Sequence, residues 1–273
     1  MTHFRPYVLL LLTLLLPACR RSEGRGGPNG RELTIFVASS LVPTFQELAD
    51  TLMSRDSSLL VRLNGGASSA LVSQLQMGGA ADLLATADER WMRIGQEKGV
   101  VVSAETFAVS SLALVISTKS HAAEFVREPL NLASPGTKVV LAAPQVPLGR
   151  YSRELLARLS HLEGYGPDFA TRVEQGVVSQ ELSAAGVLSK LRLGEADAGI
   201  IYRAQLLTDT TGTLRELPVP GARDIVAHYF IAMTRSATDS TDATSFLELL
   251  RSAKGRAVLT AHGFELPRGT PET

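Results

Sequence analysis

The stretch Asn64-Gly65-Gly66-Ala67-Ser68-Ser69-Ala70-Leu71 is a glycine-serine turn that follows the short apolar run 59–63. A second turn, Ala38-Ser39-Ser40-Leu41, follows the apolar run 33–37 in the same way. Each turn stands between a predicted strand and a predicted helix, so hydroxyls and free backbone N–H groups lie at the positive end of a helix dipole. Two such helix starts can bind an anion without any cationic side chain.

The rest of the chain continues the alternation of strands and helices that these turns begin. Segment 41–53 carries Leu41, Phe45, Leu48 and Leu52 on one face, which is the spacing of an amphipathic helix. The predicted strands are 32–38, 59–63, 81–87, 107–117, 138–143, 198–202 and 225–234. The predicted helices are 41–53, the segment from the glycine-serine turn to 77, 89–96, 151–159, 184–193 and 245–262. This order predicts an α/β fold with mainly parallel sheets and helices on both faces.

Two long β-rich runs, near 107–117 and 225–234, flank the second block of the chain. If both runs cross between two lobes, the first lobe is discontinuous and comprises 31–108 plus 230–268, and the second lobe comprises 112–226. The same pattern is compatible with one large sheet, and the residues alone leave both arrangements open.

The N-terminal 18 residues have the pattern of a targeting segment. Arg5 is followed by the apolar run 7–16, which is shorter than the ~20 residues that span a bilayer. The run ends in Leu16-Pro17-Ala18-Cys19, which resembles a bacterial lipobox and implies cleavage before Cys19 and acylation of its sulfur. Residues 19–30 then form a lipidated, glycine-rich tether. The alternative is an ordinary signal peptide with an incidental cysteine.

Charge and cysteine content exclude several classes of function. Removal of residues 1–18 leaves 26 Lys and Arg against 27 Asp and Glu, so no basic face for nucleic acid is expected. Cys19 is the only cysteine, so the chain has no internal disulfide and its stability must come from the core. The five histidines are scattered without the spacing of metal ligands, and we expect neither a cofactor nor a protein-bound metal. We expect a monomer.

Several stretches together resemble the periplasmic molybdate-binding protein family, the solute receptors of molybdate importers. The resemblance covers nearly all of 32–265 and depends on the order and spacing of these pieces. They are Phe36-Val37-Ala38-Ser39-Ser40-Leu41, Gly65-Gly66-Ala67-Ser68, Ala81-Asp82-Leu83-Leu84-Ala85-Thr86-Ala87-Asp88, Trp91-Met92, Val146-Pro147-Leu148-Gly149-Arg150-Tyr151 and Gly194-Glu195-Ala196-Asp197-Ala198-Gly199-Ile200-Ile201-Tyr202. The resemblance implies a two-lobed, type II periplasmic-binding-protein-like fold with the ligand in the cleft between the lobes.

The resemblance also implies a set of ligand contacts. In that family two helix-start serines, backbone N–H groups and a tyrosine hydroxyl hold a tetrahedral dianion. Carried over by position, the contacts are the hydroxyls of Ser40 and Ser68, the N–H groups of Leu148 and Ala184, and the hydroxyl of Tyr202, with Ser39 and Ser69 as possible additional contacts. Around Ala184 the family often has Asn-Val-Arg where this chain has Ser183-Ala184-Ala185, and Leu148 replaces a small residue.

The function implied is that of an extracytoplasmic receptor. It would capture molybdate or tungstate and deliver the anion to the permease and ATPase of an ABC importer. A lipid anchor at Cys19 would hold it on the periplasmic or cell-surface side of a bacterial membrane. The runner-up is a receptor of the same fold for sulfate, a phosphonate or an organic acid, although carboxylates favour an arginine fork that the predicted helix starts lack.

An enzyme is the rival class. Gly66-Ala67-Ser68-Ser69-Ala70 is similar to the nucleophile elbow of α/β-hydrolases, but the final glycine is absent. Ser40 and Ser68 could also be plain N-caps, and Tyr202 could be a core tyrosine with a satisfied hydroxyl. We interpret Trp91-Met92 as packing residues, and Arg150 and Arg153 as surface charges.

Overall fold

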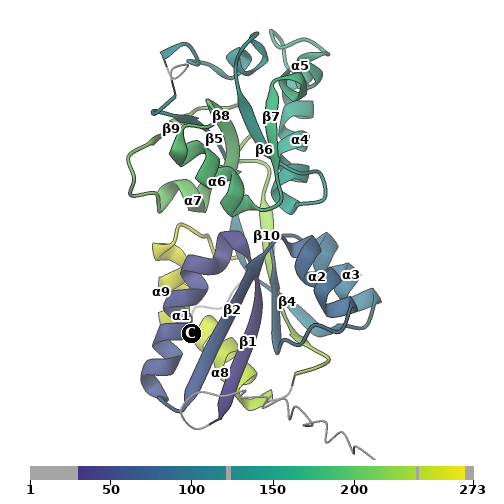
Figure 1. The fold of residues 1–273 in the computed structure, drawn as a ribbon, viewed down its shortest axis with the longest axis vertical. Helices are drawn as coiled ribbons and strands as arrows, with labels where there is room; N and C mark the ends of the chain where they lie inside the picture. The colour runs from purple at the N-terminus through teal and green to yellow at the C-terminus, as the bar shows by residue number, and fades with distance from the viewer. Residues whose placement is uncertain (1–29, 121–123, 238–239, 268–273) are drawn as a thin grey trace, which may run out of the picture.

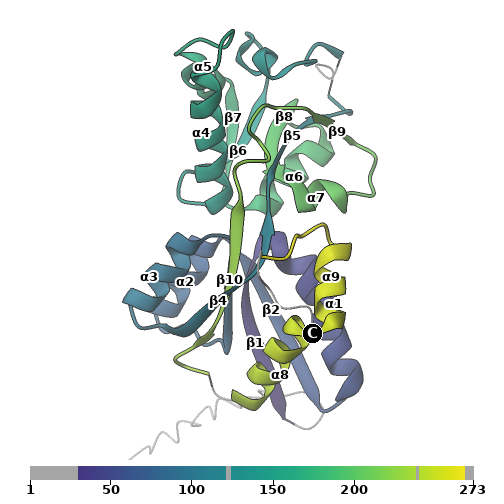
Figure 2. The ribbon, with the colours of Figure 1, turned by 180° about the vertical axis from the view of Figure 1, so that it is seen from behind.

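Two five-stranded sheets, each flanked by helices, are stacked along the long axis of the molecule (Figures 1 and 2). The structure is a computed structural model, and it describes residues 30–120, 124–237 and 240–267. The expected signal peptide, Cys19 and the tether up to residue 29 lie outside the described residues. Within the described residues, no helix is both long enough and apolar enough to cross a bilayer.

The first sheet has the strand order β2-β1-β3-β10-β4 and belongs to the lower lobe in Figure 1. Its strands are β1 (Arg31–Ala38), β2 (Leu59–Gly66), β3 (Leu83–Thr86), β4 (Val101–Ser110) and β10 (Ala227–Thr234). Its helices are α1 (Val42–Arg55), α2 (Ser68–Gln76), α3 (Glu89–Glu97), α8 (Ser240–Arg251) and α9 (Ala253–Ala261), and the 3₁₀ turn η1 (Ser39–Leu41) precedes α1.

The second sheet has the order β7-β6-β8-β5-β9 and belongs to the upper lobe. Its strands are β5 (Leu112–Ser117), β6 (Val139–Ala142), β7 (Val177–Glu181), β8 (Ala198–Tyr202) and β9 (Leu214–Leu217). Its helices are η3 (Pro129–Ala133), α4 (Pro147–Ser160), α5 (Phe169–Gln175), α6 (Ala184–Leu193) and α7 (Arg203–Leu207).

The predicted two-lobed α/β architecture is confirmed, but the sheets are mixed where mainly parallel ones were expected. β1 pairs in parallel with β2 and β3, whereas β10 lies antiparallel between β3 and β4. In the second sheet β6 is parallel to β7 and β8, and β5 is antiparallel to β8 and β9. The antiparallel pairs arise because the chain leaves and re-enters the first sheet through strands that continue between the lobes.

The chain passes between the two sheets twice. The first passage is the break between β4 and β5 at Ser111, within the run predicted as one strand at 107–117. One residue separates the two strands there, and its carbonyl accepts the Arg203 N–H at 2.8 Å. The second passage lies between Leu217 and Ala227.

The predicted terminal helix 245–262 is two helices, α8 and α9. Ser252 interrupts it, because the Ser252 hydroxyl accepts the Gly255 N–H at 3.2 Å as an N-cap. Gly255 lets α9 start directly against the end of α8, since a Cβ there would lie 2.1 Å from the Leu249 carbonyl oxygen.

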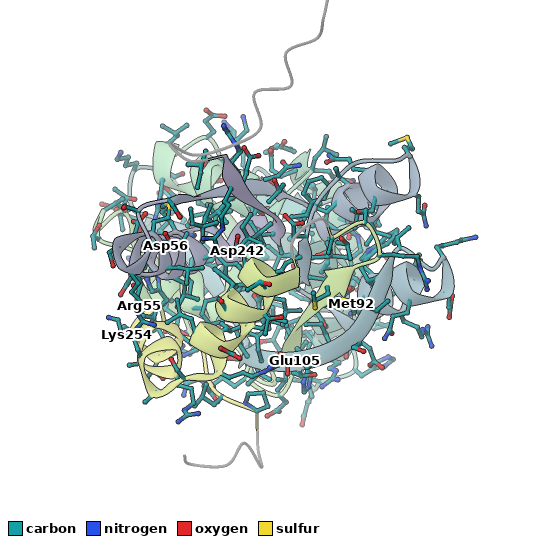
Figure 3. All side chains as sticks on the ribbon, turned by 90° about the horizontal axis from the view of Figure 1, so that it is seen from below. Arg55, Asp56, Met92, Glu105, Asp242 and Lys254 are labelled. Carbon is teal, nitrogen blue, oxygen red and sulfur yellow. The ribbon has the colours of Figure 1, made fainter. Side chains whose placement is uncertain are left out.

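Ion pairs connect three elements at the lower end of the first lobe in Figure 1. Arg31, at the start of β1, pairs with Asp56 at 2.8 Å and also with the buried carboxylate of Asp242. Figure 3, which views the molecule from below, shows Asp56 and Asp242 as neighbours on this face. The start of β1 is therefore fixed to the end of α1 and the start of α8.

Candidate functional site

The two serines predicted from the turns are buried where the first lobe faces the second. Ser68 is the first residue of α2, and its hydroxyl oxygen accepts the Ala87 N–H at 3.0 Å. Because a hydroxyl that accepts in this way still carries its proton, Ser68 can donate to a ligand. The Ser40 hydroxyl has no hydrogen-bond partner among the described residues. Neither side chain caps its helix, so the N-cap interpretation is wrong for both.

Three tyrosine side chains pack together next to Ser40. Tyr202, the last residue of β8, is buried, and its ring lies 5.6 Å from that of Tyr229 in β10 and 6.5 Å from that of Tyr151 in α4. The hydroxyls of Tyr202 and Tyr229 are both buried without a hydrogen-bond partner among the described residues. Tyr202 is therefore not a core tyrosine with a satisfied hydroxyl. Sequence reasoning missed Tyr229, because nothing marks one tyrosine inside a β-rich run.

Burial keeps these phenols protonated. It raises the pKa of Tyr202 and Tyr229 well above the usual value near 10, and it raises the pKa of Tyr151 to about 12. The Ser40 hydroxyl lies beside that of Tyr229 and lowers the Tyr229 pKa, although the two do not form a well-aligned hydrogen bond. At neutral pH each phenol is consequently a hydrogen-bond donor.

The raised tyrosine pKa values predict a loss of stability in alkali. The buried phenols resist ionisation in the folded protein, so their contribution is fully present below pH ~10 and is lost as pH rises through the folded pKa, about 12 for Tyr151. Urea unfolding between about pH 8 and 12 should show this decline, and Tyr151→Phe should make it shallower. Equal slopes for the two proteins would contradict the assignment.

The second lobe presents two helix starts to this cluster. Leu148 lies in the first turn of α4 and Ala184 is the first residue of α6, so their N–H groups have no acceptor within the helix. The Ser183 hydroxyl caps α6 by accepting the Gly186 N–H at 3.1 Å. Next to Ala184, the Ala185 N–H donates to the Ser39 hydroxyl oxygen of the first lobe at 3.3 Å.

Arg150 is partly exposed, with 38% of its side chain accessible, as a surface charge would be, but it also reaches the other lobe. It follows Gly149 in α4, its guanidinium lies 4.2 Å from the centre of the Tyr151 ring, and its Nε is buried without a partner among the described residues. One guanidinium nitrogen lies 3.5 Å from the carboxylate of Asp88, which is 1% exposed and belongs to the other lobe. The same carboxylate accepts the Trp91 N–H at 3.0 Å and so caps α3. Arg153 is partly exposed too; it pairs with Glu174 at 2.9 Å and donates to the Ala142 carbonyl at 2.8 Å.

The Asp88–Arg150 pair decides the electrostatics of the cluster. Desolvation raises the pKa of Asp88, while Arg150 and the Trp91 N–H act in the opposite direction. One negative and one positive charge thus nearly cancel beside the neutral donors. Trp91 adds a second contact across the lobes, because its indole N–H donates to the Gln145 carbonyl at 3.0 Å.

All five predicted contacts lie on the facing walls of the two lobes, and each is at most 7% exposed. Neighbour contacts connect two of the five: Ser40 lies beside Tyr229, whose ring packs on Tyr202. Ser39 joins them as the partner of Ala185. The structure does not connect Ser69 to them in this way; its carbonyl accepts the Ser73 hydroxyl at 2.9 Å.

A cavity of about 920 Å³ adjoins this cluster on the side of α1, α6, α7 and α9. Ser39, Ser40, Ala185 and Gln205 lie on its wall, whereas Ser68, Leu148, Ala184 and Tyr202 do not. We call the five predicted contacts the cage and this cavity the outer chamber; Ser40 belongs to both.

The cage contains many hydrogen-bond donors but few groups that could assist a catalytic reaction. Hydroxyls and helix N–H groups suit a small acceptor-only anion. The described residues hold no cluster of three or more His, Cys, Asp or Glu side chains that could bind a metal ion. Among the described residues, the Ser68 hydroxyl contacts a backbone N–H and no histidine. A serine nucleophile needs a histidine base, so this contact argues against the hydrolase alternative.

Two mixed α/β lobes with inward-facing helix starts and buried donors between them define a solute receptor of the periplasmic-binding-protein class. The profile of the bacterial extracellular solute-binding protein family matches residues 33–265. The chain belongs to this family, which is a family of binding proteins.

Three proteins that are similar to this chain bear on the choice of ligand. The molybdate-binding protein ModA of Mycobacterium tuberculosis is 28% identical, over 95% of this chain and 96% of that protein. The solved structure of the Azotobacter vinelandii periplasmic molybdate-binding protein matches with a TM-score of 0.73 and 20% identity, covering 86% of this chain and 100% of that one. The sulfate-binding protein SubI of M. tuberculosis also gives 0.73, at 17% identity and 88% coverage of each chain. The fold alone therefore does not select the anion.

Proposed function

We propose that this protein is an extracytoplasmic receptor that captures molybdate or tungstate and delivers it to the permease and ATPase of an ABC importer. The observation that carries the proposal is that the buried hydroxyls of Ser40 and Tyr202, where the two lobes meet, have no hydrogen-bond partner among the residues that the structure describes. Buried donors are nearly always satisfied, and a tetrahedral dianion that accepts from both lobes would satisfy them. The molybdate-binding relatives support the choice of anion.

Neutral donors suit a receptor that must release its cargo. Each hydrogen bond contributes modestly, and closure of the lobes strengthens all of them by excluding water. An anion that contacts both lobes favours the closed state, because it binds that state more tightly. A fully deprotonated oxyanion only accepts hydrogen bonds, so phosphate, which carries a proton near neutral pH, should fit a donor-only cage less well.

A second candidate is a receptor for a carboxylate or phosphonate. Arg150 favours it, since a guanidinium with a buried free Nε lies in the first turn of α4 beside the cage. The Asp88 carboxylate argues against this candidate, because it already pairs with the positive charge of that guanidinium. Thermal unfolding separates the candidates: a ligand at about 100 times its Kd adds ~2.7 kcal/mol of stability. We expect molybdate or tungstate, and neither a phosphonate nor a small carboxylate, to raise the melting temperature at micromolar concentration.

Ser40→Ala should lower the affinity for molybdate by roughly 1.5 kcal/mol, or about tenfold, without unfolding the protein. The hydroxyl makes no hydrogen bond with the described residues, so its removal costs the fold little. Ser117→Ala is the matched control, because the Ser117 hydroxyl in β5 is equally buried and unpartnered but lies outside the cluster. Equal affinities for Ser40→Ala and Ser117→Ala in calorimetric titration would remove Ser40 from the site.

We also propose that Cys19 carries the lipid anchor and that the mature receptor is a monomer. Cys19→Ser should yield an unlipidated protein that leaves the membrane fraction, since the h-region is then removed without acylation. Fractionation of cells that express each form, followed by mass spectrometry of the N-terminal peptide, measures this. A Cys19→Ser protein that stays membrane-bound would refute the anchor.

A further inference from the structure

Gln205 is a buried amide for which the proposed cage gives no role. It lies in α7, three residues after Tyr202, and is 7% exposed, although glutamine is usually a surface residue. A buried amide requires partners for both its oxygen and its nitrogen. Its surroundings therefore show what it does.

The Gln205 side chain joins the two segments of the second lobe that carry predicted ligand contacts. Its oxygen accepts the Tyr202 N–H at 3.3 Å, and its nitrogen donates to the Ala184 carbonyl at 3.5 Å. The opposite amide orientation would place oxygen against oxygen and nitrogen against an N–H group. Only the observed orientation makes both bonds.

The Ala184 carbonyl belongs to the same peptide group as the Ala185 N–H. That N–H donates to the Ser39 hydroxyl of the first lobe at 3.3 Å. Hydrogen bonds therefore run in one chain from Gln205, through this peptide group, to Ser39 across the lobes. Donation to a carbonyl polarises its peptide group and strengthens the N–H on the other side as a donor.

The chain of hydrogen bonds lies on the wall of the outer chamber. Gln205, Ala185 and Ser39 line this cavity of about 920 Å³, as Ser40 does, whereas Ala184 and Tyr202, which Gln205 joins, do not.

We propose that Gln205 is a positioning residue that holds the lobes closed over the anion through the 184–185 peptide group and Ser39. It acts through its neighbours, because it fixes Ala184 and Tyr202 relative to each other. The proposal deepens the oxyanion-receptor function and rests on it for the choice of ligand, but not for the hydrogen-bond chain itself.

The test uses Gln205→Glu, which keeps the acceptor for Tyr202 and loses the donor to Ala184. Stopped-flow measurements with molybdate should show dissociation roughly tenfold faster and association unchanged, because only the closed state is weakened. Ser39→Ala should do the same, and the double variant should add little, since both changes break one chain of bonds. Gln175→Glu, at an exposed position in α5, is the control for the added charge.

A second measurement needs no ligand. The Ala185 amide hydrogen should exchange with solvent faster in Gln205→Glu and in Ser39→Ala than in the wild type. Unchanged Ala185 exchange in both variants, or fully additive effects on dissociation, would overturn the proposal. If Gln205→Glu does not fold, Ser39→Ala together with Ala185 exchange carries the test. If the wild type binds no molybdate but Ala185 exchanges faster in the two variants than in the wild type, the proposed function is wrong and the positioning role remains supported.

Discussion

Replacing Arg150 with methionine should lower the affinity for molybdate by about 3 kcal/mol, or more than a hundredfold, near pH 7.5. The change removes the cation that faces Asp88 and leaves a carboxylate of 1% exposure unpaired beside the cage. An unpaired negative charge repels a dianion and weakens the closed state, because the pair joins the two lobes. Methionine preserves much of the volume of the arginine stem, so the loss comes from the charge.

The second site of the pair supplies the control. Asp88→Asn keeps the cap on α3, since asparagine accepts the Trp91 N–H as aspartate does. Combined with Arg150→Met it removes both charges, and the double variant should recover most of the lost affinity. A double-mutant cycle by calorimetry measures the coupling. Additive losses would show that Arg150 acts on the anion directly and not through Asp88.

Gly149→Ala should weaken molybdate binding by more than a hundredfold and also destabilise the fold by about 2–3 kcal/mol. A Cβ at Gly149 would lie 2.1 Å from the Ala143 carbonyl oxygen and 2.4 Å from that of Ala142. Because these atoms are backbone, α4 must move away from β6. The Leu148 N–H and Arg150 move with it.

Gly255→Ala is an almost perfectly matched control for this variant. A Cβ at Gly255, in α9 of the first lobe, would lie 2.1 Å from the Leu249 carbonyl oxygen and 2.4 Å from that of Leu250, both in α8. We expect urea unfolding to show similar destabilisation in both variants, and calorimetry to show a loss of affinity only in Gly149→Ala. A similar loss of affinity in both would mean that the effect of Gly149→Ala is general loosening, not displacement of the α4 start.

The positions that sequence reasoning placed on the facing walls share one feature. Ser40, Ser68 and Tyr202 each stand at a junction between a strand and a helix, and strand ends of neighbouring β-α units meet at one edge of a sheet. Their burial there followed from local pattern. Their role as ligand contacts stays a prediction, as do the roles of Leu148 and Ala184.

What the sequence could not supply is pairing across the lobes. Asp88 and Arg150 are 62 residues apart, and their contact exists only once the two lobes are placed together. The Gln205–Ala184 contact lies within the second lobe but also joins separate elements, 21 residues apart, and Tyr229 lies within a β-rich run whose alternation does not reveal where its hydroxyl ends. Such contacts depend on tertiary arrangement, which period and propensity do not encode.

Calorimetric titration of residues 20–273 with molybdate, tungstate, sulfate and phosphate at about pH 7.5 tests the central claim most directly. The proposed neutral donors, together with the molybdate-binding relatives, predict submicromolar binding of molybdate or tungstate, about −8 kcal/mol or stronger. Phosphate, which carries a proton, should not bind measurably, and sulfate should bind far more weakly than molybdate. Tight binding of sulfate, or of none of the four anions, would contradict the account and move the function to another ligand of the same fold.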